Sequence, residues 1–254
     1  MTRIASGPLK RAIIVENPST DLDQLLKDAG IDVLRLTETP TEEQLITAMQ
    51  NHRSQVIFKR SRVPVTRHLI EVCPELLAVQ LCCIGDDSVD KAACAEHGIM
   101  VFNDPVSNGR SVVELVVGTM ISLSRRLYET NVECRQGIWS KNNLERYEVL
   151  GKNLCILGLG NIGRGVARAA SALGMKIYFF DTRQVSVELG KEMGWNHIDN
   201  VDELFRLADF LTVHLSAQDI QGITNEGILT PRLFSQFGAD RMNGPRIFIN
   251  FSRG

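Results

Sequence analysis

The fold of this chain is decided by residues 154–163, which read Leu154-Cys155-Ile156-Leu157-Gly158-Leu159-Gly160-Asn161-Ile162-Gly163. The four apolar residues at the start predict a buried strand, and residues 162–173 predict a helix directly after the glycines. In such a unit Gly158 allows a tight turn, Gly160 lets the backbone approach a pyrophosphate, and Gly163 lets helix and strand pack closely. The context therefore predicts a turn that binds dinucleotide phosphates; the alternative is a tight glycine turn without a ligand.

An acidic residue follows the next predicted strand. Asp181 comes directly after residues 176–180, where a carboxylate can accept hydrogen bonds from both hydroxyls of the adenosine ribose. The same carboxylate would repel a 2′-phosphate, so NAD is predicted as the cofactor in preference to NADP. Arg183 leaves one alternative open, because an arginine two residues past the acid can either meet a phosphate or lie solvated beside the adenine.

The alternation of strands and helices extends over the whole chain. Strands are predicted at residues 11–16, 33–36, 56–58, 76–81, 99–102, 154–157, 176–180, 210–214 and 246–250. Helices are predicted at residues 21–29, 41–50, 88–97, 111–129, 162–173, 201–207 and 231–237, with Thr20 or Asp21, Thr41 and Ser88 as N-caps. Strands joined by helices of this length require right-handed crossovers, so the chain is predicted to be α/β with parallel, doubly wound sheets.

A turn-rich segment at residues 103–109 interrupts this pattern and marks the predicted domain boundary. We expect a first domain at residues 1–104 and a second at residues 105–254. The helix at residues 111–129 carries too many apolar positions for a single stripe, so it is expected to be buried on most sides, between domains or between subunits.

Composition excludes several classes of protein. The chain has 28 basic and 30 acidic residues, a net charge of −2, so no general attraction to nucleic acid or to an anionic membrane is expected. Nothing in the sequence is typical of a secretory signal or a membrane span, which gives a cytoplasmic location by default. The six cysteines lack the spacing of a metal site, and we expect reduced, mostly buried thiols and no bound metal.

With these motifs the chain resembles the D-isomer-specific 2-hydroxyacid dehydrogenase family over nearly its whole length. The resemblance rests on the glycine turn, on Asn103-Asp104-Pro105, on Ser111-Val112-Val113-Glu114-Leu115 and on Asn250-Phe251-Ser252-Arg253-Gly254. It implies a flavodoxin-like substrate domain and a Rossmann NAD-binding domain. Within the family, Arg60-Ser61-Arg62, Cys83-Ile84-Gly85 and Gly137-Ile138-Trp139-Ser140-Lys141 most resemble the 3-phosphoglycerate dehydrogenases.

The resemblance also implies roles at the nucleotide side of the site. Arg253 matches the arginine of the family's N-x-x-R-G motif, which implies that it anchors the substrate carboxylate and polarises the developing carbonyl. Phe251 and Ser252 would line the nicotinamide side of the same turn. Asn161 and Ile162 complete the cofactor turn. His214 matches a family residue near the adenine, although a structural histidine is the favoured interpretation.

Other residues are implied to bind the substrate. Arg60, Ser61 and Arg62 follow a predicted strand, so that two guanidinium groups can meet a phosphate; a solvated basic loop is the alternative. Asn108 resembles a ligand of the substrate carboxylate, or else serves the turn. Lys141 lies in a segment that in the family reaches the neighbouring subunit, which implies a homodimer or higher oligomer and a weak link to the phosphate pocket.

The resemblance implies an NAD-dependent oxidoreductase that acts on a D-2-hydroxy acid, most specifically 3-phosphoglycerate on the way to serine. The alternatives are another 2-hydroxy acid, such as glyoxylate in the reverse direction, or an NAD-sensing, corepressor-like binding protein of the same fold. The family's glutamate and histidine for proton transfer follow the arginine motif, and the sequence ends at Gly254. We therefore expect residues 1–254 to bind NAD without useful turnover.

Overall fold

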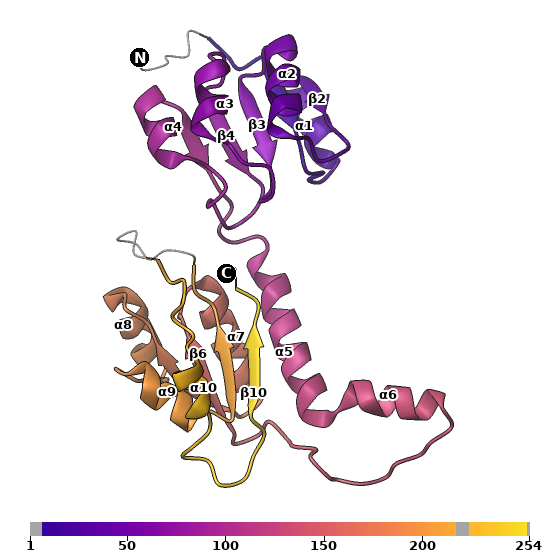
Figure 1. Cartoon of the computed structure of the whole chain (residues 1–254), viewed down its shortest axis with the longest axis vertical. Helices are drawn as coiled ribbons and strands as arrows, with labels where there is room; N and C mark the ends of the chain where they lie inside the picture. The colour runs from indigo at the N-terminus through magenta and orange to yellow at the C-terminus, as the bar shows by residue number, and fades with distance from the viewer. Residues whose placement is uncertain (1–6, 217–223, 253–254) are drawn as a thin grey trace. The chain divides into compact units, whose positions relative to one another are not determined.

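The computed structural model describes residues 7–216 and 224–252. The chain forms two compact units, unit 1 (Met1–Asn108) and unit 2 (Gly109–Gly254), each built around its own parallel sheet (Figure 1). The division between the units comes after Asn108, at the other end of the turn-rich segment from the boundary predicted after residue 104.

Unit 1 contains strands β1 (Arg11–Ile14), β2 (Asp32–Arg35), β3 (Val56–Lys59), β4 (Ala78–Leu81) and β5 (Met100–Phe102), and helices α1 (Asp21–Asp28), α2 (Glu42–His52), α3 (Arg67–Val72) and α4 (Lys91–His97). The strand order is β2-β1-β3-β4-β5, which is the flavodoxin-like order. Strand β1 therefore lies between β2 and β3, with Ile14 in register with Arg35 on one side and Phe58 on the other.

The core of unit 1 lies on both faces of this sheet. Buried residues of α2, α3 and α4, such as Leu45, Leu69 and Ala93, pack with Ile13 and Ile57 on one face. On the other face α1 packs through Leu26 against smaller residues of β1, β3 and β4. Because neighbouring strands present alternate side chains to each face, the buried runs fix the register of the parallel pairs.

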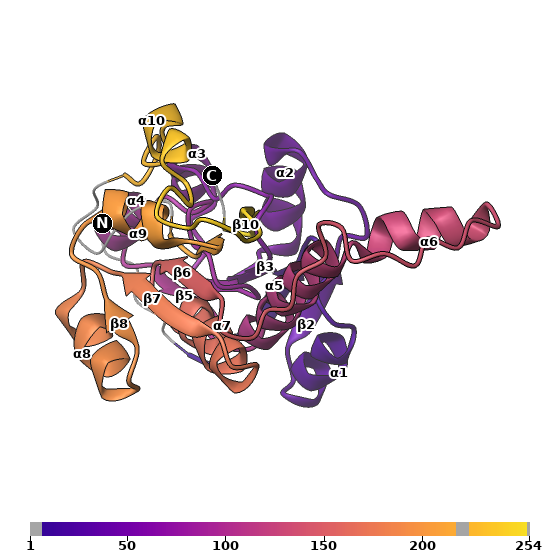
Figure 2. The ribbon, with the colours of Figure 1, turned by 90° about the horizontal axis from the view of Figure 1, so that it is seen from below.

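Unit 2 contains helices α5 (Gly109–Arg125), α6 (Leu127–Arg135), α7 (Asn161–Ala172), α8 (Gln184–Glu192), α9 (Val201–Leu207) and α10 (Pro231–Ser235), and strands β6 (Asn153–Leu157), β7 (Lys176–Phe180), β8 (Asn196–His197), β9 (Phe210–Val213) and β10 (Ile247–Asn250). The strand order β10-β9-β6-β7-β8 is that of a Rossmann sheet. One core joins α5 and α7 to one face, and a second joins α9 and α10 to the other (Figure 2).

The prediction of one continuous helix at residues 111–129 is wrong. Arg126 has a left-handed backbone with φ of 54°, which ends α5 at Arg125 and starts α6 in a new direction. The buried residues Val113, Val116 and Met120 form a stripe on α5, whereas Leu123 remains half exposed within the chain. One face of α5 thus packs on unit 2, and apolar side chains on the other face remain accessible.

Each predicted strand overlaps an observed one to within two residues at either end. The N-cap predicted at Thr41 is confirmed, because its side chain accepts a hydrogen bond from Gln44 in a capping box. The cap predicted at Ser88 is wrong: Asp90 caps α4 by accepting a hydrogen bond from the Ala93 amide. Helices α3, α6 and α8 and the short strand β8 were not predicted.

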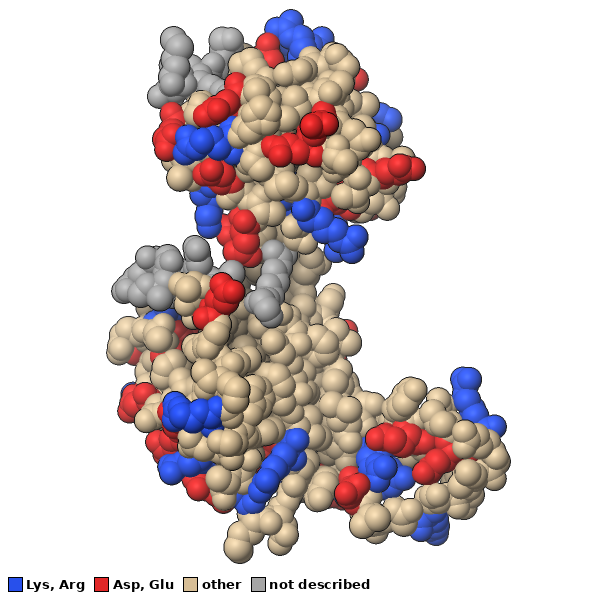
Figure 3. All heavy atoms as spheres, in the orientation of Figure 1, with Lys and Arg blue, Asp and Glu red and all other residues tan. Residues whose placement is uncertain are grey.

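The charged side chains lie mainly on the surface, and most of the cysteine thiols lie in the apolar interior. On the face drawn in Figure 3, basic and acidic side chains are interspersed over both units. The six cysteines are free thiols, and Cys73, Cys83, Cys94 and Cys155 are buried. Among the residues described, no helix combines the length and apolar character needed to cross a membrane, and no cluster of three potential metal ligands occurs.

Candidate functional site

The glycine turn of unit 2 is shaped by close backbone contacts. Gly158 has φ of 95°, and a Cβ there would lie 2.8 Å from the carbonyl oxygen of His214. A Cβ on Gly163 would lie 2.1 Å from the carbonyl oxygen of Gly158. Neither position therefore has room for a side chain. The backbone of residues 158–163 packs directly against other backbone atoms.

This turn fits the pyrophosphate of a dinucleotide. It leads from the buried strand β6 into α7, which begins at Asn161 after the side-chain-free N-cap Gly160. The first amides of a helix have no partner within the helix, and the helix dipole favours negative charge at this end. Asn161 and Ile162 supply amides of this first turn, and Ile162 also packs on the apolar core beneath.

Asp181 lies beside the turn, directly after β7, and is almost fully buried. One of its carboxylate oxygens accepts a hydrogen bond from the Leu159 amide at 2.7 Å. The other accepts from the Arg183 amide at 2.8 Å. Burial alone would raise the pKa of Asp181, but hydrogen bonds from Arg183 and Leu159 outweigh it and hold the pKa below its usual value. Asp181 is thus an ionised carboxylate held against the dinucleotide turn.

Arg183 closes over the same carboxylate with its side chain. Its Nη2 lies 2.9 Å from one oxygen of Asp181, and its Nε lies 3.1 Å from the other. The same Nη2 would lie 3.5 Å from a Cβ on Gly160, so the guanidinium group covers part of the turn. From the sequence, Arg183 was expected either to be solvated or to bind a phosphate. Neither interpretation included an ion pair with Asp181.

His214 follows β9 and forms the wall of the turn opposite α7. Its Nε2 lies 3.0 Å from Thr212 Oγ1, and its amide donates to the carbonyl oxygen of Leu157. Burial lowers the pKa of His214 to about 4, so the imidazole is neutral at physiological pH. A neutral histidine with a hydrogen-bond partner is what a structural role requires. Its carbonyl oxygen occupies the space that a side chain at position 158 would need.

The segment after β10 carries the remaining predicted nucleotide-side residues. Asn250 Oδ1 accepts hydrogen bonds from both the amide and the hydroxyl of Ser252, at 2.9 and 2.6 Å, which fixes a short turn at the carboxyl end of the strand. Phe251 is 39% exposed in this turn. Arg253, the predicted anchor of the substrate carboxylate, lies outside the described residues.

The predicted phosphate-binding residues of unit 1 lie at the carboxyl end of its sheet. Arg60 and Arg62 directly follow β3 and are exposed, and Ser61 between them is half buried. Among the residues that the structure describes, neither guanidinium group forms a hydrogen bond or ion pair, so both are available to an anion. Asn108 is exposed at the end of unit 1, and Lys141 is exposed in the segment between α6 and β6 of unit 2.

Sequence reasoning missed the polar residues that hold these loops in place. Glu16 binds the backbone of the loop of Arg60 and Arg62, and Lys59, fully buried, donates to Ser88 at 2.6 Å. The signal for Glu16 was available, because it is the last residue of the first predicted strand and must lie at the same carboxyl edge as Arg60.

A second missed group lies at the amino end of the unit 2 sheet. The fully buried Asp209 accepts hydrogen bonds from the Asn153 amide at 2.8 Å and from Arg241 Nε at 3.0 Å. Arg241 belongs to the polar loop between α10 and β10. This loop thus brings a cation to a buried carboxylate.

Comparison with known proteins agrees with these observations. Residues 117–254 match the family model described as "D-isomer specific 2-hydroxyacid dehydrogenase, NAD binding domain". D-3-phosphoglycerate dehydrogenase 2 of Saccharomyces cerevisiae is 33% identical over 242 residues, which cover 95% of this chain and 48% of that protein. D-3-phosphoglycerate dehydrogenase of Haemophilus influenzae is 39% identical over 156 residues, which cover 61% of this chain and 37% of that protein.

Solved structures share the arrangement of elements. A 2-hydroxyacid dehydrogenase from Ketogulonicigenium vulgare superimposes with a TM-score of 0.73 and 27% identity, covering 100% of this chain and 74% of that one. The chain spans about half or less of the length of the two curated relatives. It belongs to the D-isomer specific 2-hydroxyacid dehydrogenase family, and unit 2 is its NAD-binding domain.

Proposed function

We propose that this protein uses NAD to oxidise the hydroxyl group of a D-2-hydroxy acid, and that this acid is 3-phosphoglycerate, giving 3-phosphohydroxypyruvate. The observation that carries the proposal is the pair of guanidinium groups of Arg60 and Arg62 at the carboxyl edge of the unit 1 sheet, which form no hydrogen bond or ion pair with the described residues. Open α/β sheets bind ligands at this edge, and two arginines there favour a doubly charged group such as a phosphate. Two relatives named phosphoglycerate dehydrogenase support the same substrate.

The cofactor is held by the turn of unit 2. The amides at the start of α7 would bind the pyrophosphate, and Asp181 would accept hydrogen bonds from the adenosine ribose. NAD supplies, when bound, an acceptor for the hydride from C2 of the substrate. Because Arg183 covers the Asp181 carboxylate, it must turn away before the ribose can take those hydrogen bonds.

The residues that the sequence assigns to the substrate would bind its charged groups. Arg253 would bind its carboxylate and stabilise the carbonyl that develops at C2, with Asn108 as a second polar contact. Arg60, Ser61 and Arg62 would bind the phosphate, with Lys141 as a further cation. His214 is neutral and bonded to Thr212, so we do not assign proton transfer to it.

The substrate assignment is tested by Arg62→Gln in a calorimetric titration with 3-phosphoglycerate and with D-lactate. With 3-phosphoglycerate the dissociation constant is expected to rise about tenfold or more, because a charge-assisted hydrogen bond contributes about 1.5 to 3 kcal/mol. With D-lactate, which has no phosphate, it should stay the same. Arg11→Gln is the matched control, since Arg11 is also an exposed arginine of unit 1. Equal effects on both substrates would contradict phosphate recognition.

We also infer that two copies associate through α5 and the segment around Trp139. Leu123 on α5 is 49% exposed and Trp139 is 81% exposed, although both are large and apolar. Sedimentation at micromolar concentration should show a dimer, and Leu123→Glu should shift it toward monomer. A stable monomer for the unaltered protein would exclude this interface.

A further inference from the structure

Three neighbouring strands of unit 1 end in polar residues at one edge of the sheet. Glu16 follows β1, Arg35 ends β2, and Arg60 follows β3. Since β1 lies between β2 and β3 and all three run parallel, these residues come together although they are far apart in the sequence. Glu16 and Arg35 have no part in the function proposed above.

Glu16 holds the backbone of the arginine loop. One of its carboxylate oxygens accepts a hydrogen bond from the Arg60 amide at 2.8 Å, and the other accepts from the Arg62 amide at 2.5 Å. The two bonds bracket Ser61 and fix the main chain on both sides of it. Both oxygens are thereby turned toward the backbone, and such charge-assisted bonds are stronger than neutral ones.

The backbone at Glu16 is itself in an uncommon conformation. Glu16 has φ of 62° and Asn17 has φ of 51°, the left-handed region that non-glycine residues rarely adopt. Such residues persist only where the surrounding structure determines them, and they are concentrated at functional sites. The conformation directs the Glu16 side chain across the sheet edge toward β3.

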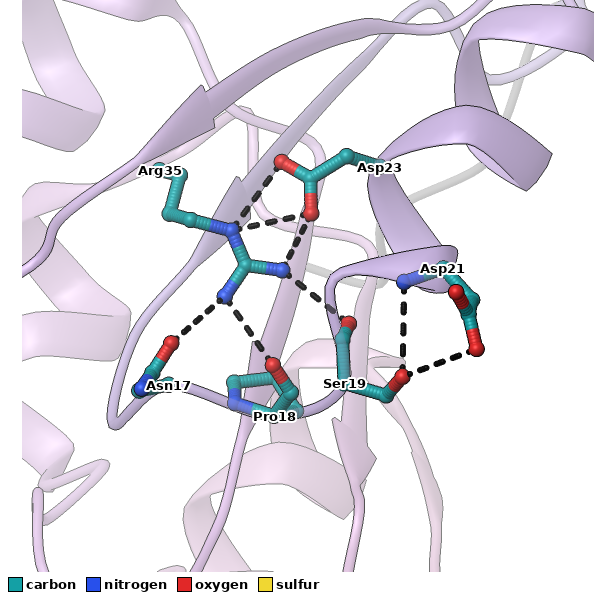
Figure 4. A network of polar contacts seen from close by, with 6 residues as sticks. All are labelled: Asn17, Pro18, Ser19, Asp21, Asp23 and Arg35. Atoms are coloured by element: carbon teal, nitrogen blue, oxygen red, sulfur yellow. Dashed lines mark hydrogen bonds and ion pairs between the residues drawn. The ribbon is translucent and has the colours of Figure 1, made fainter.

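Arg35 stabilises this conformation from the other side (Figure 4). Its guanidinium group donates to Asn17 Oδ1, to the Pro18 carbonyl at 3.1 Å and to the Ser19 carbonyl at 3.2 Å. The same group forms a double contact with Asp23 on α1, with Nε at 3.0 Å from one carboxylate oxygen and 2.9 Å from the other. The Arg35–Asp23 pair therefore fixes the loop that carries Glu16.

We infer that Glu16 is a positioning residue that holds the Arg60–Arg62 loop so that both guanidinium groups point to one anionic group of the substrate. Residues 60–62 contain no proline and no glycine, and Pro64 lies beyond the segment that Glu16 holds. Phosphate binding by these arginines rests on the function proposed above. The role of Glu16 in fixing the loop backbone does not depend on it.

The first test is hydrogen exchange of the Arg60 and Arg62 amides in the 254-residue chain. In Glu16→Gln the carboxylate charge is lost and one amide loses its acceptor, so exchange at these amides should become about tenfold faster. Glu38→Gln is the matched control, because Glu38 is an exposed glutamate of the same unit. Glu16→Asp is the substitute variant if Glu16→Gln unfolds unit 1. It keeps the charge but has a shorter side chain, so exchange at one of the two amides should become faster. Unchanged exchange in a folded variant would overturn the inference.

The second test is binding of 3-phosphoglycerate and of D-glycerate to the same chain, followed by calorimetry or NMR titration. Glu16→Gln should weaken binding of 3-phosphoglycerate about five- to tenfold, leave D-glycerate unchanged, and have no further effect in an Arg62→Gln background. Equal weakening of both ligands, or the same loss in the Arg62→Gln background, would overturn the positioning role. If Arg62→Gln alone changes neither ligand, the phosphate assignment fails instead, and the exchange experiment alone decides the role of Glu16.

Discussion

The two sheets present ligand-binding edges that are built in different ways. In unit 2 the edge is made by the main chain: Gly158 and Gly163 bring backbone atoms together so closely that no side chain fits. In unit 1 the edge is made by side chains, since Glu16 and Arg35 hold loops that contain no glycine between residues 15 and 20 or 59 and 63. A backbone-built edge has a short sequence signature, whereas a side-chain-built edge depends on residues from several strands.

The difference predicts how each edge responds to substitution. In unit 2 a single added methyl group should be as harmful as a large side chain, because the contact is with the backbone. In unit 1 the loops should lose their conformation only when a charged residue that holds them is removed. Its removal leaves the partner charge without a counterion, or the loop amides without an acceptor.

The largest effect is expected for Gly163→Ala. The new Cβ would lie 2.1 Å from the Gly158 carbonyl oxygen, so the turn must open. We expect unit 2 to lose about 3 kcal/mol of stability and NAD affinity to fall about a hundredfold, measured by denaturation and calorimetry. Gly118→Ala is the matched control: it is also a helical glycine, nothing lies within 4 Å of its Cβ position, and it should stabilise α5. Unimpaired NAD binding by Gly163→Ala would show that the turn is not backbone-built.

The next effect is expected for Arg35→Met in unit 1. It leaves Asp23 and three loop acceptors without their donor and should cost about 2 kcal/mol. Both tryptophans of the chain, Trp139 and Trp195, lie in unit 2, so tryptophan fluorescence should show unchanged unfolding while circular dichroism shows earlier unfolding of unit 1. Arg67→Met, which breaks a more exposed pair with Glu96, should cost much less, because solvent screens surface ion pairs. Equal costs would argue against a special role for Arg35.

A smaller, pH-dependent effect is expected at His214. Its pKa is lowered from 6.5 to about 4 by burial, so the unfolded state binds a proton more readily than the folded state between these values. Stability is therefore fully retained above pH 6.5 and is lost as the pH falls toward 4. His214→Gln should remove about 1 to 2 kcal/mol of this pH dependence, seen in Trp195 fluorescence. If the free energy of unfolding changed with pH equally in the unaltered protein and in His214→Gln, His214 would be protonated in the folded state without loss of stability.

The smallest effect is expected for Arg53→Gly and measures the cost of left-handed backbone in unit 1. Arg53 ends α2 with φ of 55°, and its side chain is 64% exposed. Glycine should raise the stability of unit 1 slightly, because strain is relieved and only a surface ion pair with Glu75 is lost. A loss of stability would mean that the left-handed residues of this unit carry little strain, Glu16 included.

The comparison also explains how much the sequence could predict. The Gly158–Gly163 turn and Asp181 were found because backbone geometry restricts residue type, and the strands were found because their buried runs are apolar. Arg35 and Arg241 were missed because an ion pair between residues distant in sequence leaves no local pattern, and Glu16 was missed because its carboxylate binds backbone amides of a distant loop. The break at Arg126 was missed for a related reason: arginine is an ordinary helix residue, and the turn is held by contacts with residues farther along the chain, such as Arg146 to the Arg125 carbonyl and Glu145 to Arg126.

The buried carboxylate of Asp209 has a consequence for the order in which unit 2 opens. Asp209 bonds to Asn153 of β6, its carbonyl oxygen accepts from the Ile247 amide of β10, and its charge is balanced by Arg241 in the loop before β10. Edge strands usually fray first, because one side of their backbone is unpaired. Here β10 cannot detach with its loop unless a fully buried charge is left without its partner. Strand β10, the outermost strand in the described part of this sheet, is therefore tied to the central strand β6, and β6, β9 and β10 should exchange their amides in one cooperative event.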